Sequence, residues 1–115
     1  EDIRNTMNAE IIHRQTFAKG SAKITFDREK IIEDILKKRQ DRKSLFLVIG
    51  YASVSGNNPS NRELSAKRAT RVASLVKILK ADDQQVKAVY LGETKRFSPD
   101  AEIENQICEI WEIKI

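Results

Sequence analysis

Apolar and polar residues recur along this chain with two different periods, and the first quarter of the sequence contains both. Over residues 2–15 the apolar positions recur every three to four residues, which predicts a short amphipathic lead-in helix. These positions are Ile3, Met7, Ile11 and Ile12. Gly20 and Ser21 then interrupt the pattern. Residues 22–26 alternate strictly, which predicts a half-buried strand with Ala22, Ile24 and Phe26 facing inward.

Two longer segments have the apolar spacing of helices that bury one face. The first begins near Asp27, whose carboxylate can cap the first turn, and its predicted buried positions are Ile31, Ile32, Ile35 and Leu36. The second begins at Ser60, which has the spacing of a capping box with Glu63. Its predicted buried positions are Leu64, Val72, Leu75, Val76 and Leu79.

Three further segments are short and apolar, as strands are. Residues 45–49 form a continuous apolar run before Gly50, which is expected of a central strand covered on both faces. Residues 86–91 predict a third strand and residues 107–115 a fourth. This order of elements predicts an α/β (α+β) two-layer sandwich, in which a mixed four-stranded sheet carries both main helices on one face.

Length and composition predict one ordinary globular domain, with 115 residues of which 40% are hydrophobic and 33% charged. We expect residues 1–21 to be a lead-in segment and residues 22–115 to be the domain. The apolar runs are too short to span a bilayer, so any membrane contact would come through a segment outside this chain. Although the net charge is +4, basic and acidic residues are interleaved, which predicts solvated helix faces and no nucleic-acid partner.

Residue types that carry out catalysis are sparse in this sequence. Cys108 is the single cysteine and His13 the single histidine, and they lie far apart along the chain. A catalytic thiol needs a base beside it, so Cys108 is interpreted as a small apolar strand residue. The motifs supply no nucleophile–base pair, no carboxylate pair and no metal cluster. We therefore expect no enzyme, no bound metal and no cofactor.

Four motifs in order resemble the OmpA-like peptidoglycan-binding domain, the type found in the OmpA C-terminal region, MotB and Pal. The third is the most specific, because it is similar to the family string Asn-x-x-Leu-Ser-x-x-Arg-Ala-x-x-Val. The motifs are Ile24–Asp27, Val48–Ser53, Asn61–Leu75 and Asn105–Ile110. The resemblance covers residues 22–115.

The resemblance implies a non-catalytic domain of the bacterial periplasm that attaches an envelope protein to peptidoglycan without a covalent bond. Its ligand is the diaminopimelate of the stem peptide, which carries an ammonium and a carboxylate, so the site needs an acid and a base. By position the base is Arg68 and the acid position is Ser53, fifteen residues apart as in the family. The other ligand-binding candidates are Asn61, Asp27 and Leu64, although Asn61 is equally suited to capping its helix.

Two departures from the family pattern make the ligand site divergent. Ser53 stands where the family has Asp, and a hydroxyl accepts a hydrogen bond from an ammonium without neutralising it, a loss of about 1.5–3 kcal/mol. Gln106 and Ile107 replace two arginines, and Glu93 is a candidate substitute acid. Two functions therefore stay open. One is weak peptidoglycan anchoring, and the other is a scaffold that binds other envelope proteins of a secretion or motor-type complex.

Overall fold

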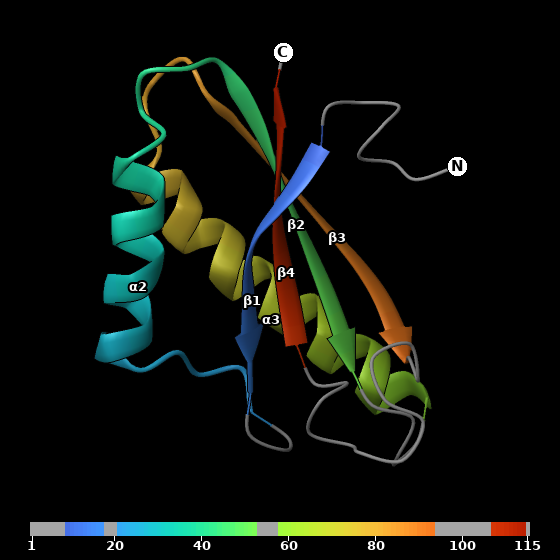
Figure 1. Ribbon diagram of the computed structural model, residues 1–115. Coiled ribbons are helices and arrows are strands. Elements are labelled where there is room, and N and C mark those ends of the chain that lie inside the picture. The colour runs from blue at the N-terminus through green and yellow to red at the C-terminus, as the bar shows by residue number, and fades with distance from the viewer. Residues whose placement is uncertain (1–8, 18–20, 53–57, 94–106, 115) are drawn as a thin grey trace.

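Four strands form one mixed sheet in the order β1-β4-β2-β3 (Figure 1). The computed structural model describes residues 9–17, 21–52, 58–93 and 107–114, without the side chains of 52, 58–62 and 91–93. The strands are β1 (Ala9–Thr16), β2 (Ser44–Ala52), β3 (Gln85–Glu93) and β4 (Ile107–Lys114). β2 is parallel to β3 and antiparallel to β4, and β1 is antiparallel to β4. The sheet is therefore mixed and four-stranded, as predicted.

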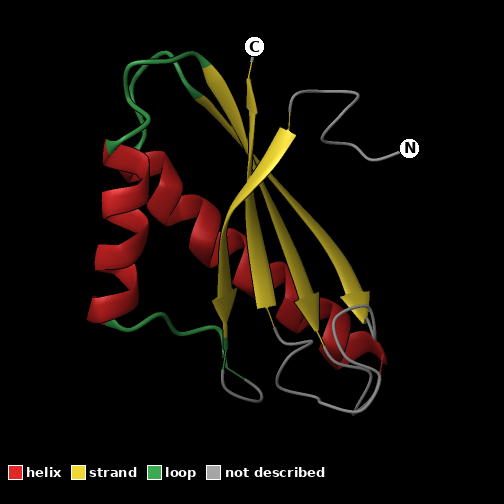
Figure 2. Ribbon diagram, in the orientation of Figure 1, coloured by secondary structure: helices red, strands yellow, loops and turns green. Residues whose placement is uncertain are grey.

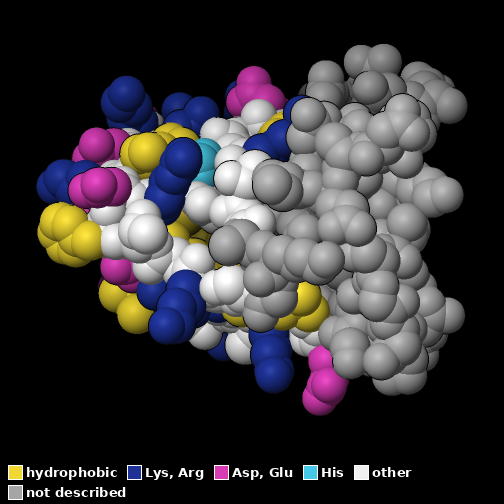
Figure 3. Space-filling model, turned by 90° about the horizontal axis from the view of Figure 1, so that it is seen from below, with side chains coloured by type: hydrophobic (Ala, Val, Ile, Leu, Met, Phe, Trp, Pro, Cys, Tyr) yellow, Lys and Arg dark blue, Asp and Glu magenta, His cyan; other side chains and the backbone are white. Residues whose placement is uncertain are grey.

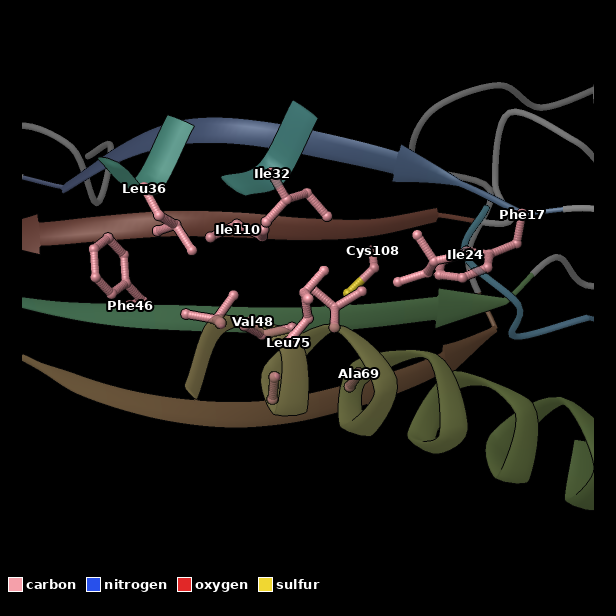
Figure 4. Close-up of a cluster of buried hydrophobic side chains, with 13 residues drawn as sticks. Phe17, Ile24, Ile32, Leu36, Phe46, Val48, Ala69, Leu75, Cys108 and Ile110 are labelled. Carbon is pink, nitrogen blue, oxygen red and sulfur yellow. The ribbon is translucent and has the colours of Figure 1, made fainter. Parts of the chain in front are cut away.

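Two helices join the strands, α2 (Phe26–Lys37) between β1 and β2 and α3 (Asn58–Leu79) between β2 and β3 (Figure 2). Both helices pack on one face of the sheet, because their buried side chains belong to a single core cluster (Figure 4). The cluster includes Ile32 and Leu36 from α2, Val72 and Val76 from α3, and Phe46, Val48, Cys108 and Ile110 from the sheet. No helix in the described part of the chain is long and apolar enough to cross a membrane.

β2 has one face in the core and one face half-exposed. Phe46 and Val48 are completely buried toward the helices. The alternate residues Leu45, Leu47 and Ile49 point to the opposite face and are only half-buried. The prediction of a central strand is confirmed by the position of β2 between β4 and β3. The prediction that both of its faces are fully covered is wrong.

The predicted lead-in helix is wrong where the structure describes it, because residues 9–16 form the edge strand β1. Ile11 and Ile12 fitted a helical period, but so few apolar positions are a weak signal. Pairing with β4 satisfies a row of backbone N–H and C=O groups that would otherwise lie at a sheet edge. The register shifts between Ile11 and His13, and this irregularity blurs the alternation in the sequence. Residues 1–8 lie outside the described residues.

The strand predicted over residues 22–26 is also wrong. Residues 21–25 belong to no element, and Phe26 is the first residue of α2 and is 79% exposed. Of the predicted inward residues, Ile24 is buried and packs in the core cluster. Thr25 is the N-cap of α2, so Asp27 lies inside the first turn and does not cap it. An acid in the first turn still interacts favourably with the partial positive charge at the helix N-terminus.

The predicted apolar faces of the helices are largely confirmed. Val72, Leu75 and Val76 are buried, whereas Leu64 is half-buried. In α2 the exception is Ile31, which is exposed. α3 begins at Asn58, so the predicted capping box of Ser60 and Glu63 falls inside the helix. On the face seen in Figure 3, basic side chains of the described residues are interspersed with acidic ones, as the sequence pattern predicted.

Candidate functional site

The backbone of α3 packs directly against Gly50, near the carboxyl end of β2. A Cβ atom at position 50 would overlap the carbonyl oxygen of Ser65 and would lie 3.0 Å from the Ala69 Cβ and 3.1 Å from the Ala69 nitrogen. A glycine is therefore required for the helix to approach the strand this closely. The close approach fixes the turn of α3 between Ser65 and Ala69, and this turn carries Arg68.

Arg68 extends from that turn to the end of β2 and is completely buried. Its Nε donates a hydrogen bond to the Ser21 carbonyl oxygen at 2.9 Å, and its Nη1 donates to the Tyr51 carbonyl oxygen at 3.3 Å. The guanidinium carbon lies 5.1 Å from the centre of the Phe17 ring, within the range of a cation–π interaction. The guanidinium therefore joins the residue after β1, the segment before α2 and the end of β2.

The charge of Arg68 is energetically costly in this environment. Burial lowers the pKa of Arg68 to about 10, because desolvation disfavours the charged form. An electrostatic interaction with Cys108 offsets part of this effect. At neutral pH the guanidinium still carries its proton. A guanidinium interacts with a carboxylate more strongly than with a neutral ligand, because charge-assisted hydrogen bonds are stronger than neutral ones.

An open cavity of about 400 Å³ lies beside this arginine. Two of its lining residues, Phe17 and Ser21, also contact the Arg68 guanidinium. Lys23 and Arg28 also line it and are exposed, so the cavity has a basic rim. The geometry and the charge of this end of the sheet suit a small acidic ligand.

The structure describes some of the predicted site residues but not all of them. Asp27 is exposed in the first turn of α2, and Leu64 is half-buried one turn before Arg68. Asn61 lies in the first part of α3, and its side chain is not described. Ser53 lies outside the described residues. Glu93 is the backbone partner of Ala52 across β2 and β3, which places it at the same end of the sheet as Arg68.

A buried carboxylate on the opposite face of the sheet was missed by the sequence analysis. Glu109 of β4 is completely buried and accepts hydrogen bonds from the Tyr51 hydroxyl, the Trp111 Nε1 and the Arg14 Nε, each at 3.2 Å. The sequence feature that could have revealed it is an acid between apolar neighbours in a strand. A carboxylate buried at such a position is nearly always paired. Ile107, at one of the two positions where the family has arginine, is buried.

A second buried acid, Glu112, lies toward the other end of β4. It accepts hydrogen bonds from the Ser44 hydroxyl at 2.7 Å and the Arg39 Nε at 3.3 Å, and Arg42 Nη1 lies 3.5 Å away. These contacts fasten the connection between α2 and β2 to the sheet, far from Arg68. In the described ranges, no group of three or more His, Cys, Asp or Glu side chains is arranged to hold a metal ion.

The family model of the OmpA family matches residues 16–107, so the chain belongs to the OmpA family. The family is known for binding peptidoglycan in the bacterial envelope, and its domains are non-catalytic. No curated protein is similar enough in sequence to the chain to count as a match.

Solved structures agree with this assignment. The C-terminal domain of Helicobacter pylori MotB is similar with a TM-score of 0.75 and 25% identity, over 90% of this chain and 87% of that chain. The peptidoglycan-associated lipoprotein of Burkholderia pseudomallei has a TM-score of 0.68 and 20% identity, over 86% of this chain and 88% of that one. The first of these proteins is described in other crystals as a periplasmic domain, in agreement with the predicted location.

Proposed function

We propose that this domain binds the stem peptide of peptidoglycan non-covalently in the periplasm, with Arg68 holding the carboxylate of diaminopimelate. The observation that carries the proposal is the placement of Arg68, the base of the family motif. Its guanidinium is fixed by the carbonyl oxygens of Ser21 and Tyr51 at the end of β2. Ser53, the acid position of the family, follows Tyr51 by two residues in the sequence.

The charge of the site supports a carboxylate ligand. Arg68 is a buried cation, and the rim of the adjoining cavity carries Lys23 and Arg28. A guanidinium presents a planar fork of donors that matches a carboxylate, which lysine does not. Asn61, Leu64 and Asp27 stay predicted contacts of the same ligand.

A pull-down with purified sacculi tests the proposal. Wild-type protein is expected to co-sediment, and Arg68→Ala is expected to lose about 10- to 150-fold in affinity, the effect of one charged hydrogen-bonding group of about 1.5–3 kcal/mol. Arg71→Ala is the matched control, because Arg71 lies on the same helix but pairs with Glu29 at 2.9 Å. Equal retention of wild type and Arg68→Ala, with both folded, would contradict the proposal.

A second candidate function is a scaffold that has kept the fold and lost the ligand. Two observations favour it: Arg68 is completely buried by its own chain, and Ile107 is buried where the family has arginine. In this case Arg68 only stabilises the junction between β1, α2 and β2. The expected partners are then other envelope proteins of a larger complex.

The substitution Ser53→Asp separates the two candidates. In a functional site the new carboxylate would meet the diaminopimelate ammonium and increase affinity by about 1–2 kcal/mol, with a smaller gain at high salt. The gain should disappear in an Arg68→Ala background, because one charge cannot orient a zwitterion. Calorimetric titration with a diaminopimelate-containing stem peptide measures the affinity of Ser53→Asp with and without Arg68→Ala. If folded Ser53→Asp protein does not bind, the scaffold function is supported.

A further inference from the structure

Tyr51 connects the two faces of the sheet at the end of β2. Gly50 faces α3, so the next side chain along the strand points to the opposite face. There the Tyr51 ring is buried, and its hydroxyl donates to Glu109 Oε1 at 3.2 Å. On the backbone of the same residue, the carbonyl oxygen accepts the hydrogen bond from Arg68 Nη1 at 3.3 Å. One residue therefore contacts both the buried carboxylate and the candidate site.

Glu109 is itself held on several sides. Trp111 Nε1 donates to the same Oε1 atom, and Arg14 Nε donates to Oε2, each at 3.2 Å. Glu109 is paired with Arg14 across β1 and β4 and with Ile49 across β2 and β4. Its carboxylate is completely buried, so a change in its position would have to move at least two strands. The position of the Glu109 carboxylate is therefore restrained, and the Tyr51 hydroxyl is hydrogen-bonded to it.

The geometry points to a role for Tyr51 and Glu109 as positioning residues of the Arg68 site. The hydroxyl–carboxylate bond restrains the Tyr51 side chain and with it the direction of the Tyr51 peptide. The direction of that peptide sets the location of the carbonyl oxygen that receives Arg68 Nη1. On the β4 side the register of β2 ends at Gly50 and Cys108, so Tyr51 has no registered partner in β4. On the β3 side Tyr51 is paired with Gly92, just after a shift in the register. Toward β4, a side-chain restraint therefore contributes what the ladder does not.

The test compares two substitutions that each remove one donor from the same carboxylate oxygen. Tyr51→Phe removes the hydroxyl and keeps the buried ring, whereas Trp111→Phe removes the indole N–H. Tyr51 also contacts Arg68 through its carbonyl oxygen. The first measurement is the ¹H and ¹⁵N NMR signals of the Arg68 guanidinium without ligand, with the melting temperature of each variant as the measure of general damage.

Tyr51→Phe is expected to shift the Arg68 signals and to speed hydrogen exchange at its guanidinium. Trp111→Phe is expected to lower the melting temperature at least as much and to leave the Arg68 signals in place. Equal shifts in both variants, or no shift in Tyr51→Phe, would overturn the positioning role, since either result would make Glu109 a general stabilising residue only.

The second measurement is affinity for the diaminopimelate-containing stem peptide, and it rests on the proposed function. Tyr51→Phe should weaken binding by about 2- to 10-fold, the range expected for one hydrogen bond, and Trp111→Phe should change it less. If wild-type protein does not bind the peptide, the proposed function fails. The NMR comparison still decides the positioning role, because it needs no ligand.

Discussion

The carbonyl oxygen of Ser65 in α3 lies against the Cα of Gly50 in β2, at a separation that leaves no room for a side chain. Helix and strand thus meet backbone to backbone, which is closer than two elements with side chains at the contact can approach. Arg68 lies one residue short of Ala69 in the same helical turn, so its position depends on this contact.

Gly50→Ala is therefore expected to destabilise the domain. The added methyl group would push α3 away from β2, an overpacking effect that costs about 1–3 kcal/mol. Chemical denaturation measures the loss. Ser74→Ala, on the exposed side of α3, should stay within about 0.5 kcal/mol of wild type. An unchanged free energy of unfolding for Gly50→Ala would show that the helix can move away from the strand without cost.

Two apolar residues on α3 offer a matched test of the core. Leu75 is buried in the core cluster, whereas Ile78, three residues further on, is 79% exposed. Leu75→Ala is expected to cost about 2–5 kcal/mol, because it removes buried apolar surface and leaves a cavity. Ile78→Ala should cost less than about 0.5 kcal/mol. Similar losses for both variants, measured by urea denaturation, would contradict the assigned orientation of the helix.

The free energy of unfolding is expected to decrease at mildly acidic pH because of His13. Burial is the main cause that lowers its pKa below 6.5, so the folded state disfavours the imidazolium. Below pH 6.5 the unfolded chain therefore binds more protons than the folded one, and the free energy of unfolding falls until the pH passes the folded pKa. His13→Gln should flatten this part of the profile. A decline of equal size in the variant would assign the effect to other groups.

Cys108 is expected to be inert in the folded protein. Its side chain is completely buried, and burial raises its pKa, so almost no thiolate forms at neutral pH. An aromatic disulfide reagent should react slowly with native protein and rapidly in denaturant. Rapid reaction of native protein at a rate independent of denaturant would show that the core around β4 opens freely.

The sequence was sufficient to predict three of the four strands, the two helices and most of their buried positions, because these follow from periodic apolar residues. Val72 and Leu75 are examples, since both lie in a regular i, i+3 pattern. The failures occurred near the N-terminus. β1 is defined by its pairing with β4 almost a hundred residues away, for example between His13 and Ile110, and local periodicity contains no information about that partner.

The candidate site was predicted only in part for a related reason. Arg68 was recognised because it lies in a specific string on one helix. Its contacts with the Ser21 and Tyr51 carbonyl oxygens involve backbone atoms, which every residue has, so no residue pattern marks them. Glu109 was visible as an acid in an apolar strand, but its partners Arg14 and Tyr51 come from other strands.

The order β1-β4-β2-β3 also governs when the domain can assemble during synthesis. The strand made first, β1, has its place in the sheet beside β4, the strand made last. β1 must therefore wait, unpaired, until nearly all of the domain has been translated. Contacts of such long sequence separation form slowly. Completion of the four-stranded sheet is therefore expected to be a late step in the folding of this domain.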